Sequence, residues 1–116
     1  MRKEVWGLLA LTTLAVTELA FSRPQRHEMG SLRGWQCERK GCNKRYQDGW
    51  MVEFNHIIPV EEGGPDTEDN AELLCLEHHL EFHKKRGDFR AWKSIEGRIK
   101  KSRGGHTWDW IRKNGR

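Results

Sequence analysis

Apolar residues are unevenly spread along this chain, and their spacing predicts a few short elements. One continuous apolar run covers residues 5–16, and the apolar positions after it are sparse. Residues 50–58 are rich in side chains that favour β-strands and are followed by Pro59, so they predict a strand. Leu73 and Leu74 form a second short apolar stretch further along.

Two helices are predicted in the second half of the chain. The spacing of Leu76, Leu80 and Phe82 predicts a helix over residues 76–86, which ends near Gly87. Asp88 is a candidate cap for a final packing helix. Its apolar positions recur at roughly helical spacing and are Phe89, Trp92, Ile95 and Ile99.

A shorter helix is predicted before these elements, over residues 24–32. Pro24 suits a first helical turn, Met29 and Leu32 are spaced to face inward, and Gly34 would end the helix. Residues 63–70 contain Gly, Pro, Asp and Asn with no helical or strand period, so they predict an ordered surface loop.

Composition limits the chain to one domain with a small core. Its 116 residues are 35% hydrophobic and 33% charged, so another source of stability is expected. The formal charge of +4 is compatible with a polyanionic partner, because clustered Lys and Arg replace counterions on a phosphate backbone, although many basic proteins bind no nucleic acid.

The pattern divides the chain into three parts. Residues 1–22 have a basic start and an apolar run, and they resemble a signal peptide but equally suit an accessory helix that packs on the domain or a partner. Residues 23–101 contain the predicted domain, and residues 102–116 form a basic, glycine-rich tail. Membrane association could come only through residues 1–22, and the sequence leaves the location open: cytoplasmic, or exported or tethered if that segment acts as a signal.

Three cysteines and a histidine predict a structural zinc site. Cys37, Cys42 and Cys75 are an odd set, which does not suit a disulfide scaffold. His78 follows Cys75 at the spacing of a zinc knuckle, so Cys37-x4-Cys42 and Cys75-x2-His78 together supply four ligands for tetrahedral zinc.

A second set of polar residues predicts a separate, catalytic metal site. His79 and His83 are four residues apart on the predicted helix and therefore share one face, where both can bind one divalent ion. Asn55 and His56 end the predicted strand, and Asn70 closes the loop.

The order of these motifs over residues 35–88 resembles the HNH endonuclease family, whose relatives include the DNase colicins. The resemblance is carried by Phe-Asn-His-Ile-Ile-Pro at 54–59, Gly-Gly-Pro-Asp at 63–66, Asn70, and Leu-Cys-Leu-Glu-His-His at 74–79. It implies an α+β fold, namely a small ββα-metal (HNH, or His-Me finger) domain with a zinc knuckle and flanking helices.

The same resemblance implies a function and a set of roles. The chain would be a metal-dependent endonuclease that hydrolyses phosphodiester bonds of nucleic acid, with DNA as the expected substrate and 5′-phosphate products. His56 would be the general base, Asn70 would hold the His56 segment in place, and His79 and His83 would bind a catalytic Mg²⁺ or another divalent ion, beside the structural Zn²⁺.

Asn55 departs from the family pattern, in which an Asp, Glu or His commonly precedes the base and binds the metal. Its amide oxygen is a neutral and weaker donor, so Asn55 is a candidate third ligand. This departure also keeps open an alternative function, a zinc-stabilised nucleic-acid-binding or assembly module that has lost cleavage. His27 and His106 have no partner at a useful spacing and are expected at the surface.

Overall fold

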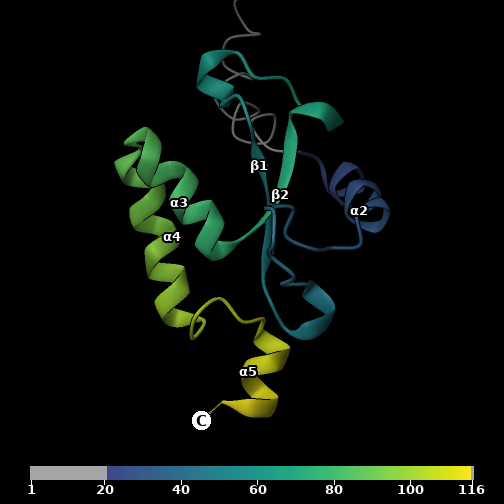
Figure 1. Cartoon of the computed structure of the whole chain (residues 1–116), viewed down its shortest axis with the longest axis vertical. Helices are drawn as coiled ribbons and strands as arrows, with labels where there is room; N and C mark the ends of the chain where they lie inside the picture. Colours follow the sequence, from purple (N-terminus) through teal and green to yellow (C-terminus); the bar gives the residue numbers. More distant parts are fainter. Residues whose placement is uncertain (1–20, 116) are drawn as a thin grey trace, which may run out of the picture.

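The computed structural model describes residues 21–115, which form a small α+β domain around a two-stranded sheet, as predicted. Figure 1 shows α3 and α4 together on one side of the strands, α2 on the other, and α5 at the end opposite the β1–β2 loop. In chain order the elements are α2 (Arg23–Leu32), β1 (Val52–His56), β2 (Ala71–Cys75), α3 (Leu76–Arg86), α4 (Phe89–Lys101) and α5 (Trp108–Asn114).

The two strands pair antiparallel, with Val52 opposite Cys75 and His56 opposite Ala71. Because side chains alternate along a strand, Phe54 points to the α2 side, where its ring lies 6.2 Å from that of Phe21. Glu53 and Asn55 therefore share the opposite face, toward α3. One face of β1 thus packs into the hydrophobic core, and the other face points toward α3.

Helix α3 has the predicted bounds and ends at Gly87, which has a left-handed φ of 79°. Asp88 is the N-cap residue of α4, but its carboxylate does not cap the helix, because it binds His83 and Arg86 instead. In α4, Ile95 is buried as predicted, whereas the prediction for Phe89 is wrong: 61% of this residue is exposed. Phe89 lies in the first turn, where its ring packs only edge-on against Trp92.

Helix α2 begins with a capping box formed by Ser22 and Gln25. Met29 is buried as predicted, but the prediction that Leu32 faces inward is wrong, because 73% of Leu32 is exposed. Leu32 is the last residue of α2, and the chain turns away at Arg33 before it returns to the sheet. The predicted signal-like or accessory segment at residues 1–22 lies outside the described residues except for Phe21 and Ser22.

The predicted tail contains a helix, α5, which Thr107 caps by accepting a hydrogen bond from the Trp110 backbone N–H. His106, predicted to lie at the surface without a partner, is half-buried, and its ring stacks on Trp50 at 4.1 Å and on Trp110 at 3.6 Å. Trp110 is therefore packed against His106, whereas 67% of Trp108 is exposed.

Within residues 21–115 no helix is both long and apolar enough to span a membrane.

Candidate active site and metal cluster

The four predicted zinc ligands converge in the folded chain. The ligand atoms of Cys37, Cys42, Cys75 and His78 all lie within 4.8 Å of one another. His78 presents Nδ1, which is 3.3 Å from Cys37 Sγ and 3.4 Å from Cys75 Sγ. Three thiols and one imidazole nitrogen are a donor set that tetrahedral zinc prefers. The cluster is therefore compatible with a zinc knuckle.

The surroundings of this cluster favour a bound cation. Burial, together with the charges of Cys37 and Cys42, raises the pKa of Cys75 to about 12. A divalent cation would offset that accumulated charge. Ion pairs join the knuckle to the rest of the domain, since Arg39 lies 3.1 Å from Glu72 of β2 and 3.2 Å from Glu81 of α3.

His79 and His83 form a separate pair on the adjacent face of α3. Their ring centroids are 4.9 Å apart, and His78, one residue earlier, turns instead toward the thiols. A helix turns by about 100° per residue, which separates the two sets. The single helix α3 therefore presents one histidine to the cluster and two to a second site.

Both histidines of this pair are oriented by carboxylates that the sequence analysis did not assign. His79 Nδ1 lies 2.9 Å from Glu53 Oε1, and His83 Nδ1 lies 2.8 Å from Asp88 Oδ2. Such contacts fix the imidazole tautomer and ring direction in metal sites. Strand alternation could have found Glu53, two residues before Asn55, but nothing in the sequence pattern singled out Asp88 as a histidine partner.

Both carboxylates are ionised at neutral pH. Burial alone would raise the pKa of Glu53, but hydrogen bonds from His79 and Arg98 outweigh burial and hold it below its ordinary value. The hydrogen bond from His83, with Arg86, holds the pKa of Asp88 below its ordinary value. An ionised carboxylate can only accept, so each histidine donates from Nδ1 and keeps Nε2 for a metal.

Asn55 is buried on the same strand face as Glu53, and only 4% of it is exposed. Its Nδ2 atom has no hydrogen-bond partner among the described residues. Buried amide groups are nearly always paired, so an orphaned one calls for a specific explanation. An amide that turns its oxygen into this space would suit a cation, and Asn55 therefore fits the candidate catalytic site.

Asn70 is the anchor of the loop that follows β1. Its Oδ1 accepts a hydrogen bond from Ile58 N at 2.8 Å, and its Nδ2 donates to Ile58 O at 3.1 Å and Pro65 O at 2.9 Å. Gly64 allows this close approach, because a Cβ there would lie 1.7 Å from Ile58 O. The loop that Asn70 closes begins directly after His56.

His56 ends β1 and is largely enclosed, with 13% of its side chain exposed. Its Nε2 atom lies 2.6 Å from Asp66 Oδ1, and its ring is stacked on Phe21 with centroids 4.1 Å apart. Neither partner was predicted. Asp66 lies in the Gly-Gly-Pro-Asp motif, but no sequence signal connects Phe21 to this site.

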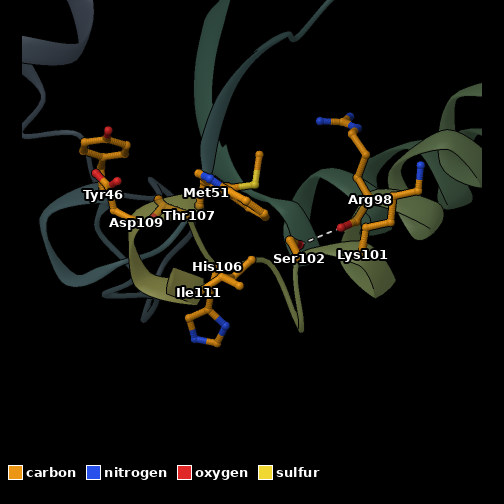
Figure 2. A pocket seen from close by; sticks show the side chains of 10 residues that line it. Tyr46, Met51, Arg98, Lys101, Ser102, His106, Thr107, Asp109 and Ile111 are labelled. Carbon is orange, nitrogen blue, oxygen red and sulfur yellow. Dashed lines mark hydrogen bonds between the residues drawn. The ribbon is translucent and has the colours of Figure 1, made fainter. Parts of the chain in front are cut away.

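A cavity of about 440 Å³ lies at the other end of the sheet. Met51, just before β1, and residues of α4 and α5 line it, and Figure 2 shows Arg98 and Lys101 on one side with Tyr46 and Asp109 on the other. β1 places His56 about 13 Å from Val52 at the start of the strand, since each residue rises about 3.3 Å. The cavity is therefore separate from His56, while its lining residue Arg98 pairs with Glu53, the partner of His79.

Comparison with known proteins matches the segment that contains both sites. Residues 37–85 match the family model described as HNH endonuclease. A 50-residue segment is 42% identical to the type IV methyl-directed restriction enzyme EcoKMcrA of Escherichia coli (strain K12). The aligned segment covers 40% of this chain and 18% of that relative. Among solved structures, none matches the chain significantly.

The aligned segment thus spans less than a fifth of that relative's length. The family match nevertheless begins at Cys37, the first knuckle ligand, and extends past His83, so it covers the cluster, the loop and the histidine pair together. Residues 37–85 of this chain therefore form a domain of the HNH endonuclease family.

Proposed function

We propose that this protein is a metal-dependent endonuclease that hydrolyses phosphodiester bonds of DNA. The observation that carries the proposal is the pair formed by His79 and His83, whose Nδ1 atoms are both bound by carboxylates. This arrangement leaves two Nε2 atoms for one ion, a use of carboxylates that is typical of metal-binding histidines.

DNA is the proposed substrate because of the HNH domain and the relative that shares it. That relative is a restriction enzyme by name, and the positive charge of this chain suits a polyanion.

The chain's own residues divide the work of hydrolysis. His56 takes a proton from the attacking water, for which an imidazole is suited near neutral pH. His79, His83 and Asn55 would hold the divalent ion, Mg²⁺ or another. When bound, that ion neutralises negative charge on the phosphate and on the leaving oxygen. Asn70 acts through the loop, by keeping the chain after His56 in place.

The Cys37, Cys42, Cys75 and His78 cluster is proposed to hold a structural zinc. All four positions are filled by protein ligands, and a closed tetrahedral site stabilises a fold without taking part in chemistry. The two metals are thus assigned to adjacent faces of α3.

A plasmid-nicking assay tests the proposal, with Mg²⁺, Mn²⁺, Ni²⁺ or Zn²⁺ added to the wild-type protein. We expect cleavage with at least one ion, and at least about a hundredfold loss in His56→Ala with DNA binding retained, because a general base acts on the chemical step. Activity of His56→Ala within a few-fold of wild type would contradict the assignment.

The histidine pair has its own control. His79→Ala and His83→Ala should raise the concentration of added ion needed for cleavage while the knuckle zinc stays bound. Release of that zinc by either change would mean that the two histidine sets have been assigned in reverse. DNA binding without cleavage by any ion would instead support the alternative function, a zinc-stabilised binding or assembly module, for which the neutral Asn55 is the supporting feature.

A further inference from the structure

The imidazole of His56 is held by two side chains outside the histidine and asparagine motifs. Asp66 Oδ1 lies 2.6 Å from Nε2. The Phe21 ring covers one face of the imidazole at 4.1 Å, with an angle of 11° between the planes. The stacked Phe21 ring limits rotation of the imidazole, and the Asp66 carboxylate contacts its Nε2 atom.

Asp66 is itself fixed from both sides of its backbone. Its carbonyl accepts a hydrogen bond from Gln25 Nε2 at 2.6 Å, and the preceding carbonyl of Pro65 accepts one from Asn70 at 2.9 Å. Gln25 belongs to the capping box that begins α2. Because this loop is already fixed, the Asp66 carboxylate loses little further conformational entropy when it orients His56.

We infer that Asp66 is a positioning residue that selects the tautomer of His56, an inference that rests on the proposed function. An ionised carboxylate only accepts hydrogen bonds, so His56 Nε2 carries the proton and Nδ1 keeps the lone pair. None of the described residues is hydrogen-bonded to His56 Nδ1. Nδ1 is therefore the nitrogen left to act as the base.

The proton and charge balance of the step is consistent with this role. Water gives one proton to His56 Nδ1, its oxygen bonds to phosphorus, and the bond from phosphorus to the leaving oxygen breaks. The leaving oxygen takes a proton from solvent. The imidazolium that forms then faces the Asp66 carboxylate, which stabilises the new positive charge.

This geometry also extends the active site beyond the family domain. Phe21 and Gln25 precede residues 37–85, yet one contacts His56 and the other fixes Asp66. The N-terminal end of α2 therefore belongs to the machinery that positions the base.

Nitrogen NMR of the histidine rings tests the inference without any cleavage. In the full chain with its metal bound, we expect His56 to be the Nε2–H tautomer, assigned by its absence from the spectrum of His56→Ala. Asp66→Asn, whose amide can turn and donate, should move His56 toward the Nδ1–H tautomer. Asp69→Asn is the matched control, because Asp69 is exposed in the same loop and its carboxylate accepts a hydrogen bond from Thr67, not from a histidine, among the described residues. A wild-type Nδ1–H tautomer, or no change in Asp66→Asn, would overturn the inference.

Cleavage kinetics supply the second readout. Asp66→Asn should lower kcat at least about tenfold with KM changed less than about twofold, and Asp66→Glu should recover part of the loss because it keeps the carboxylate. Wild-type kcat in Asp66→Asn would overturn the role in positioning. If the tautomer changes as expected but the wild-type protein cleaves no DNA, the proposed function fails while the assignment of the tautomer to Asp66 is supported.

Discussion

Asn55 and Asn70 are both buried, but their hydrogen bonding is opposite. Asn70 uses both ends of its amide on Ile58 and Pro65, whereas Asn55 Nδ2 has no partner among the described residues. An unsatisfied buried polar group costs about 1–3 kcal/mol. The sequence motif identified both residues, but only the structure shows that Asn70 is a loop anchor and Asn55 is available for another partner.

Asn55→Asp tests whether Asn55 binds the catalytic ion. A carboxylate attracts a divalent ion by charge as well as by coordination, so the variant should need a lower Mg²⁺ or Mn²⁺ concentration for half-maximal cleavage. Metal titrations of cleavage by the two proteins measure this. The knuckle zinc should be unaffected.

Asn114→Asp is a suitable control, because it adds the same charge at an exposed position in α5. An unchanged or raised metal requirement in Asn55→Asp would remove Asn55 from the set of ligands. In that case the new charge would only repel the phosphate of the substrate.

The glycine within helix α4 lies where a larger side chain would fit. Gly97 is exposed within the helix, and a Cβ there would meet no atom within 4 Å. Gly97→Ala should therefore stabilise the protein by about 0.5–1 kcal/mol, since alanine loses less backbone entropy in a helix. Chemical denaturation measures the change.

Gly64→Ala is the opposing case in the β1–β2 loop. Its Cβ would lie 1.7 Å from Ile58 O and 2.9 Å from Asn70 Nδ2, so the loop must shift to accept it. We expect a loss of about 1–3 kcal/mol in stability, together with lower activity. Equal effects of the two substitutions would show that the loop is less closely fitted than its contacts indicate.

The bounds of the elements were largely predictable from local pattern. The range 76–86 was confirmed as α3 because its apolar spacing and Gly87 are local signals. The inward positions of Leu32 and Phe89 were wrong because each lies at a helix end, where periodicity continues but the partner surface does not. Helix α5 was missed, since its docking depends on Trp50 and His106.

The hydrophobic core is small for a domain of this size. Nine apolar residues are buried in the described part of the chain, and two of these, Cys37 and Cys75, belong to the metal cluster. A domain with so little apolar burial commonly depends on an added staple, and here the cluster joins the knuckle, β2 and α3.

We therefore expect one tightly bound zinc that is required for folding. Removal of zinc by a chelator, or Cys37→Ser, should abolish the cooperative unfolding transition and most helical signal in circular dichroism. Metal analysis of the purified protein gives the stoichiometry. His83→Ala should keep both the zinc and the fold, since it lies outside the cluster. A protein that is folded and zinc-free would refute the prediction.

The sequence by itself determined the cluster of Cys37, Cys42, Cys75 and His78 and the order of strand, loop and helix. Spacing along one helix is enough to separate His78 from His79 and His83, because the period of the helix is fixed by its backbone. Only the tertiary structure decided which side chains contact the histidines. Glu53, Asp66, Asp88 and Phe21 reach their histidines through pairing of the strands, closure of the loop and docking of α2. Those contacts depend on distances in space between residues that no local pattern relates.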